Sequence, residues 1–214
     1  MASLFAHGFV AASAGLLPRF QKHRGWILLL GAAAAIAPDA DVLAFHFGIP
    51  YGDPFGHRGA THSIAFAFVL AALLTLPFRR AYPFGFLEGE RDFVRKPSVG
   101  ATSKTGTGRG GGRILFVYFF VCTLSHALLD ALTNGGLGVA FFFPFDSTRY
   151  FFPDEWRVIQ VSPIGVRNFL SERGLSVIVS ELKFVAAPWI AALAGALIIK
   201  IVLARKPRPD ASGS

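Results

Sequence analysis

Charged side chains are scarce in this sequence. Only 16% of its 214 residues are Asp, Glu, Lys or Arg, whereas soluble domains carry about a quarter. Hydrophobic residues make up 53%, phenylalanine alone occurs 23 times, and the mean hydropathy is +0.50. This balance excludes an ordinary soluble domain and predicts an integral membrane protein whose partner is the lipid bilayer.

The sequence also has only one cysteine and lacks several catalytic motifs. The single cysteine, Cys122, excludes an intramolecular disulfide, and its apolar neighbours indicate a small buried side chain. The glycine-rich stretch 106–110 lacks the Gly-Lys-Ser/Thr ending of a phosphate loop, so we interpret it as linker. Neither the Gly-x-Ser-x-Gly elbow nor the His-Glu-x-x-His zinc motif occurs, which excludes the hydrolases built on them.

Five apolar runs are separated by polar or turn-rich segments: 3–17, 26–47, 64–78, 114–132 and 184–204. The first run is shorter than the roughly 17 residues that a spanning helix needs, and no Lys or Arg precedes it, as a signal peptide would require. We expect a retained, half-buried helix there and a break at Pro38 in the second run. The sequence predicts an all-α integral membrane bundle, with four or five membrane-embedded helices in one domain over 1–204 and a disordered tail at 205–214.

The basic residues predict the orientation of this bundle. The net charge is +8, and the segments 19–24, 79–113 and 200–208 contain 15 of the 21 Lys and Arg residues. They lie in segments between and after the apolar runs and do not follow the interleaved basic and aromatic pattern typical of single-strand binding proteins, so we expect no nucleic acid partner. The positive-inside rule instead predicts that 79–113 is a cytoplasmic loop and 134–183 an outer-side segment.

Histidines and aspartates gather on the predicted outer side. Such residues are costly at the ends of apolar segments and indicate a function there. His126 and Asp130 are four residues apart and therefore share one helix face; a simple ion pair would also explain them. Imidazole and carboxylate are the usual ligands of zinc, and manganese or iron are alternatives. The predicted divalent metal site comprises His7, Asp39, Asp41, His57, His62, His126 and Asp130.

A metal site of this kind predicts hydrolysis of a phosphoester, because bound metals activate water and neutralise phosphate. We assign catalytic roles to Asp39, His62 and Arg58, with the Arg58 guanidinium holding the substrate oxyanion. The substrate is either a small molecule or a lipid, and the oligomeric state stays open. The alternatives are an ion or proton transporter and a structural protein stabilised by metal. Thr133, Asn134 and Glu181 are candidates to orient ligands or, for Thr133 and Asn134, to cap a helix.

These motifs together resemble a known family. His7, Pro38-Asp39-Ala40-Asp41, the stretch 57–63, Ser125-His126-x3-Asp130-x2-Thr133-Asn134, and Phe143-Pro144-Phe145 with Arg149 are similar to the YdjM/YbcI-like bacterial inner-membrane proteins. The resemblance covers about residues 1–165. It implies a multi-pass protein of the bacterial inner membrane and a membrane-bound, metal-dependent hydrolase activity.

Overall fold

The computed structural model describes residues 2–3, 6–8, 11, 23–82, 110–163 and 166–204. Most of the first apolar run, the centre of the predicted cytoplasmic loop and the predicted disordered tail lie outside these ranges. Within them the chain is helical, and two isolated bridges, Thr133 with Ile159 and Val139 with Tyr150, are the β-type pairings. The predicted all-α fold class is confirmed.

The second apolar run forms two different helices in succession. Helix α2 (Arg24–Ile36) ends just before Pro38, and the chain continues as the 3-10 helix η2 (Ala37–Phe47). Proline lacks a backbone N–H and its ring crowds the preceding turn, so a regular α-helix cannot run through it unchanged. Gly48 then ends η2 with a positive φ of 74°. The tighter winding begins at Ala37 and places Asp39 and Asp41 at one end of the bundle.

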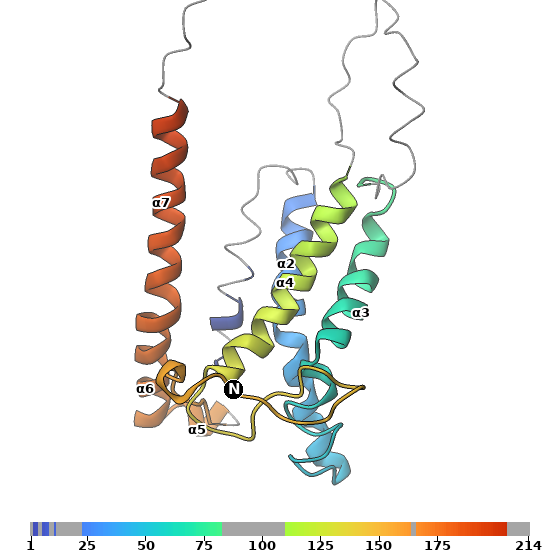
Figure 1. The fold of residues 1–214 in the computed structure, drawn as a ribbon, viewed down its shortest axis with the longest axis vertical. Helices are drawn as coiled ribbons and strands as arrows, with labels where there is room; N and C mark the ends of the chain where they lie inside the picture. Colours follow the sequence, from blue (N-terminus) through green and yellow to red (C-terminus); the bar gives the residue numbers. More distant parts are fainter. Residues whose placement is uncertain are drawn as a thin grey trace, which may run out of the picture.

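Helices α3 (Ile64–Thr75) and α4 (Gly111–Ala131) complete a three-helix bundle with α2. The Ser63 side chain accepts a hydrogen bond from the Phe66 amide at 3.0 Å and caps α3, and the short 3-10 helices η3 (Ala60–His62) and η4 (Leu76–Phe78) flank it. Helix α4 packs against both α2 and α3. Buried apolar side chains such as Ile27, Leu115 and Phe119 form the core between these helices (Figure 1).

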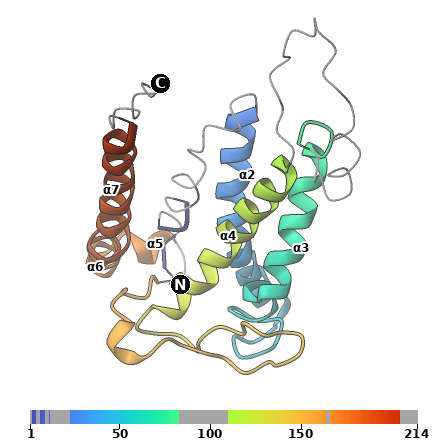
Figure 2. The same cartoon turned by 45° about the horizontal axis from the view of Figure 1, so that its top comes forward.

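The C-terminal part of the described chain forms a separate arm. After η5 (Asp154–Trp156) and α5 (Val166–Phe169), helix α6 (Glu172–Glu181) leads through the π-helical turn η6 (Leu182–Ala186) into α7 (Ala187–Ala204). Figure 2 shows α7 standing to one side of the α2–α3–α4 bundle, as Figure 1 does. The apolar helix expected from residue 184 therefore continues a helical segment that begins at Glu172.

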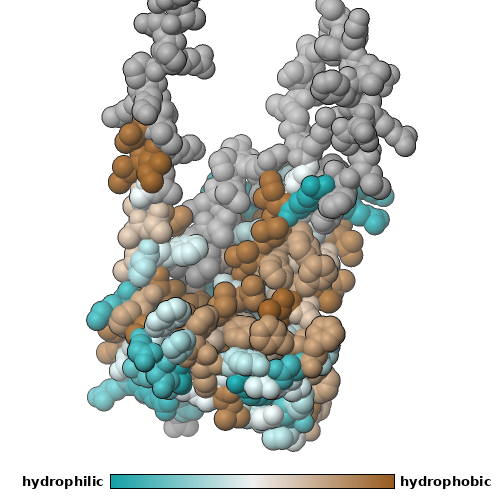
Figure 3. Space-filling model, in the orientation of Figure 1, coloured by the Kyte–Doolittle hydropathy of each residue, from teal (hydrophilic) through white to brown (hydrophobic). Residues whose placement is uncertain are grey.

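Within the described residues, three helical segments are long and apolar enough to cross a membrane: Arg24–Phe47, Gly111–Ala131 and Glu172–Gly195. Ile64–Phe78 is a shorter apolar helix beside them. These four segments correspond to four of the five apolar runs, and most of the fifth, 3–17, lies outside the described ranges. Apolar side chains cover the helical middle of the molecule, and polar ones gather at the end where the 132–163 segment lies (Figure 3). The opposite end carries residues 79–82 and the start of α4 (Figure 1).

Candidate metal centre

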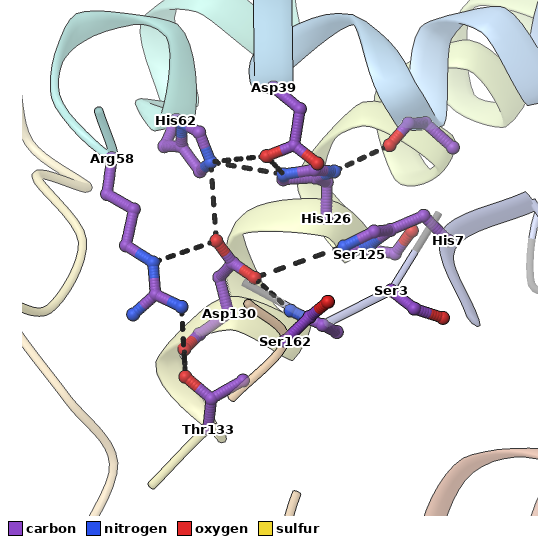
Figure 4. A network of polar contacts seen from close by, with 12 residues as sticks. Ser3, His7, Asp39, Arg58, His62, Ser125, His126, Asp130, Thr133 and Ser162 are labelled. Carbon is purple, nitrogen blue, oxygen red and sulfur yellow. Dashed lines mark hydrogen bonds and ion pairs between the residues drawn. The ribbon is translucent and has the colours of Figure 1, made fainter. Parts of the chain in front are cut away.

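Two histidine rings face each other at the polar end of the bundle (Figure 4). Nε2 of His126 on α4 lies 3.0 Å from Nε2 of His62 on η3. On its other side, Nδ1 of His126 lies 2.7 Å from the carbonyl oxygen of Ala35. Because a carbonyl can only accept a hydrogen bond, Nδ1 carries the proton and Nε2 of the neutral ring presents a lone pair.

The His62 ring is oriented in the same manner. Its Nδ1 lies 3.2 Å from Oδ2 of Asp41, so Nδ1 donates to the carboxylate, and in the neutral form of the ring Nε2 presents a second lone pair toward His126. Burial alone would lower the pKa of His62, but its contacts with Asp130 and Asp41 outweigh burial and raise that pKa. Two lone pairs 3.0 Å apart repel, and a proton or a metal ion between them relieves the repulsion.

Two carboxylates complete this group. Oδ1 of Asp39 lies 3.2 Å from Nε2 of His126, and Oδ2 of Asp130 lies 3.4 Å from Nε2 of His62. One atom from each of the four side chains falls within 4.8 Å of the other three. Both oxygens of Asp39 are buried and make no hydrogen bond, which is costly for a carboxylate. The group of Asp39, His62, His126 and Asp130 can hold a metal ion.

Asp41 holds the neighbouring imidazoles. Its Oδ1 lies 2.6 Å from Nδ1 of His57, and its Oδ2 accepts from the Thr61 hydroxyl at 2.7 Å and from the Arg58 amide at 3.1 Å. Asp41, His57 and His62 form a second group with metal-ligand spacing. In this structure both Asp41 oxygens already receive donors, so the carboxylate fixes the orientation of His57 and His62.

Arg58 is completely buried and its guanidinium contacts protein on every nitrogen. Nε lies 2.9 Å from Oδ2 of Asp130, Nη1 donates to the Gly135 carbonyl at 2.9 Å, and Nη2 donates to the Thr133 hydroxyl at 3.0 Å. The residue also adopts a positive φ of 64°, which is uncommon outside glycine and concentrates at functional sites. The sequence predicted that Arg58 grips the substrate; in this arrangement it holds Asp130 instead.

The loop after α4 is shaped around Arg58. Gly136 has a φ of +92°, and a Cβ there would lie 2.7 Å from Nη1 of Arg58, so this position accommodates only glycine without a shift. A second arginine, Arg149, donates to the carbonyls of His57 at 2.7 Å, Asp53 at 2.9 Å and Tyr51 at 3.0 Å. Arg149 thereby ties the 139–152 segment to the loop that carries His57 and Arg58.

The start of the chain packs against this cluster. The His7 ring stacks on His126 with centroids 3.7 Å apart, and its Nε2 lies 3.9 Å from Oδ1 of Asp130. Both ring nitrogens of His7 are buried without a hydrogen bond. The Ala2 amide donates to Oδ1 of Asp130 at 2.6 Å, and Ser3 donates to Glu181 through its amide and its hydroxyl. Glu181 therefore holds residues next to the cluster rather than the imidazoles themselves.

The structure brings all seven candidate ligands of the sequence analysis into one network, together with Arg58. His46 lies outside it with an exposed side chain, and the Asn134 side chain pairs with Gln160. The contact of the Ala35 carbonyl with His126 could not be found from the sequence, because it involves the backbone of Ala35 and not its side chain. The motif of Phe143-Pro144-Phe145 with Arg149 drew attention to Arg149 in the sequence. It does not reveal the three backbone carbonyls that Arg149 contacts.

The charges in this network favour a cation. Three carboxylates, Asp39, Asp41 and Asp130, surround one guanidinium, that of Arg58, and each of these residues is at most 7% exposed. With neutral imidazoles this leaves two negative charges without compensation among these groups, and buried unpaired charge is strongly unfavourable. One divalent ion balances them, and nitrogen and oxygen donors suit zinc, manganese or iron.

Comparisons with known proteins agree with the membrane fold. A family model described as YdjM inner membrane protein matches residues 1–207. The inner membrane protein YbcI of Escherichia coli strain K12 is 36% identical over 162 residues, which cover 76% of this chain and 78% of YbcI. No solved structure matches this chain.

Proposed function

This chain belongs to the YdjM inner membrane protein family, and we propose that it is a metal-dependent hydrolase that cleaves a phosphoester at the outer surface of the inner membrane. The observation that carries this proposal is the convergence of two imidazole nitrogens and two carboxylate oxygens within 4.8 Å. A divalent ion, with zinc as our first choice, would supply an acidified water molecule and would polarise a phosphoryl oxygen. Hydrolysis then joins the water oxygen to phosphorus, breaks the ester P–O bond and leaves a proton on the departing alcohol.

In this proposal some residues of the cluster bind the ion, and others hold these ligands in position. Asp39, His62, His126 and Asp130 bind the ion. The Ala35 carbonyl and Asp41 keep the two imidazoles in the tautomer that leaves Nε2 free, which is how hydrogen bonds outside the ligand set usually tune a metal site. Arg58 fixes Asp130, so its part in catalysis is to position a ligand.

His57 and His7 have different surroundings, and we assign them differently. Nδ1 of His57 is paired with Oδ1 of Asp41 at 2.6 Å. We therefore assign His57 to fixing the position of Asp41, and it is not required as a ligand. His7 lies outside the group of four, and we keep it as a further candidate ligand because its buried ring nitrogens make no hydrogen bond and its Nε2 lies 3.9 Å from Oδ1 of Asp130.

The position of the buried ionisable groups favours an enzyme over a conduit. An ion path requires polar groups through the depth of the bilayer. In the described part of the chain the buried histidines, aspartates, arginine and glutamate gather at one end. Elsewhere in the bundle, the buried hydroxyls of Thr75 and Thr123 are satisfied by carbonyls of their own helices. The basic residues Arg24, Arg79, Arg80 and Arg113 lie toward the opposite end, which supports an outward-facing site.

Metal analysis of purified variants tests the proposal. We expect one divalent ion per chain in the wild type loaded with zinc in detergent, and less than a tenth of that in His62→Ala and His126→Ala. His46→Ala is the matched control, since His46 is exposed and outside the cluster, and it should keep its ion. The same samples are assayed with a soluble phosphodiester and with phospholipid vesicles.

Two results would contradict the proposal in different ways. If both cluster variants keep their metal, the cluster is not a metal site and the transporter interpretation gains. If metal binds as expected but the loaded wild type cleaves neither class of phosphoester, the metal site stands and the hydrolase assignment is wrong.

A further inference from the structure

A cavity of about 320 Å³ lies between α4 and the junction of η6 with α7. One wall comes from α4, with Leu128, Leu129 and Leu132. The other comes from the arm, with Phe184, Val185 and Trp189. Apart from Ser125, the lining side chains are apolar. Its volume is at the lower end of the range of about 300–1,000 Å³ typical of ligand pockets. We call this cavity the α4–α7 groove.

The groove is continuous with exposed apolar surface of the candidate spans. Its two walls belong mostly to the candidate spans Gly111–Ala131 and Glu172–Gly195. Leu128 and Phe184 line the groove, yet each is also 39% exposed. Leu182 and Ile190, next to the arm wall, are 59% and 54% exposed. A hydrocarbon chain can therefore pass from the bilayer into the groove without crossing a polar surface.

The groove and the metal centre share the same turns of α4. Ser125 and Leu129 line the groove, and the residues that follow them, His126 and Asp130, belong to the metal cluster. Figure 4 draws Ser125 together with that cluster. The first residues touch both features: Ala2 and Ala6 pack with Ile159 and Val185 of the groove lining, and the Ala2 amide donates to Asp130. An apolar chain in the groove would thus end beside the ligands.

We propose that the α4–α7 groove binds one acyl chain of a membrane lipid whose phosphoester head group reaches the metal centre. This inference rests on the proposed function and narrows its substrate class to lipids. A small water-soluble phosphoester has no hydrocarbon chain that an apolar groove could bind. A lipid explains both features: a divalent ion held by the cluster would attract the phosphate of the head group, and the apolar groove matches the chain. The groove opens on the bilayer, which supplies such chains at high concentration.

Photolabelling tests chain binding without requiring any hydrolysis. The protein is reconstituted in vesicles that contain phosphatidylglycerol with a diazirine in one acyl chain, and labelled residues are mapped by mass spectrometry. We expect at least fivefold more label on Leu128–Leu132 and Phe184–Trp189 than on the lipid-facing surface around Val121. Leu128→Trp, which fills the groove, should reduce the groove label at least fivefold, and Leu128→Phe should give an intermediate reduction.

Val121→Trp is the matched control, since Val121 lies two turns earlier on α4, is 44% exposed and does not line the groove. It should leave the groove label unchanged. Equal label over the groove and the Val121 surface, or an unchanged groove label in Leu128→Trp, would overturn the proposal.

Hydrolysis then separates this inference from the proposed function. Leu128→Trp should lower kcat/KM for the phospholipid at least tenfold and leave that for a soluble phosphodiester unchanged. Groove labelling should also persist in His126→Ala. If labelling behaves as expected and the wild type hydrolyses nothing, the proposed function fails and the chain site stands. If Leu128→Trp lowers both kcat/KM values equally, the groove does not select the lipid and the inference fails.

Discussion

The three-helix bundle of α2, α3 and α4 and the arm of α6, η6 and α7 use apolar residues for different purposes. In the most apolar stretch of α4, 50% of residues are buried within the protein, compared with 22% in the stretch from Glu172 to Gly195. The bundle packs a larger share of its apolar side chains against neighbouring helices, although some, such as Leu29 and Phe68, are more than half exposed. The arm presents side chains such as Ile198, Ile199 and Val202 outward, each about 60% exposed, as a helix that faces lipid does.

This difference explains where the polar cluster lies. Buried charges need fixed partners on all sides, and the bundle provides them from η2, η3 and α4 within a few ångströms. The arm contributes one buried carboxylate, Glu181, and otherwise an apolar wall. We infer that the bundle holds the chemistry and that the arm faces the hydrocarbon. Matched substitutions in the bundle and in the arm test this division of roles.

The largest contrast is expected between Asp130→Asn in the bundle and Glu181→Gln in the arm. Asp130→Asn leaves the buried Arg58 without its carboxylate, and removing one partner of a buried ion pair costs about 3–5 kcal/mol. Glu181→Gln keeps an acceptor oxygen for Ser3, so its cost should be nearer about 1 kcal/mol. Chemical unfolding in detergent with EDTA present measures both without a contribution from metal.

The double variant Arg58→Met/Asp130→Asn supplies the control for that pair. Because it removes both charges, it should be less destabilised than the sum of the two single variants, as expected for coupled residues. Additive losses would mean that the Arg58–Asp130 contact is not what stabilises the site.

A smaller contrast concerns two glycines in spanning helices. A Cβ at Gly31 of α2 would overlap the Tyr118 side chain of α4, whereas a Cβ at Gly195 of α7 meets nothing within 4 Å. Gly31→Ala should therefore destabilise the bundle by about 1–3 kcal/mol, the usual cost of overpacking, and Gly195→Ala should not destabilise at all. Thermal unfolding in detergent compares them; equal midpoints would show that α2 and α4 do not pack this closely.

The smallest contrast compares two helix caps. Ser63 accepts a hydrogen bond from the Phe66 amide at the start of α3, whereas Ser171 makes no side-chain cap bond at the start of α6. Ser63→Ala should cost about 1 kcal/mol, typical of a lost cap, and Ser171→Ala should change the unfolding free energy by much less. Equal losses in the two variants would refute the assigned difference between the caps.

Much of the fold could be predicted because its signals are local. The apolar runs and Pro38 predicted the helices and the break in the second of them. The i and i+4 spacing of His126 and Asp130 predicted their common face. Each of these features depends on residues a few positions apart, where helix geometry alone decides the outcome.

The arrangement within the candidate site could be predicted only in part. Charge and hydropathy predicted that seven ionisable residues share one end of the bundle. They could not predict that Arg58 turns inward, since this depends on its left-handed backbone and on the space left by Gly136. Nor could they reveal that the Ala35 carbonyl orients His126, because backbone acceptors look alike in every sequence. Tertiary packing supplies these contacts, and their roles in metal binding stay predictions.

The burial of the four candidate ligands has a consequence for the kinetics of metal exchange. Asp39 is 7% exposed, and His62, His126 and Asp130 are at most 1% exposed, while Arg149 clamps the loop above them through three carbonyls. An ion held at this centre would exchange with its surroundings only when the loop opens, an event whose frequency depends on local stability. The residence time of the ion would then be set by the lifetime of the Arg149 clamp rather than by the strength of any single metal–ligand bond.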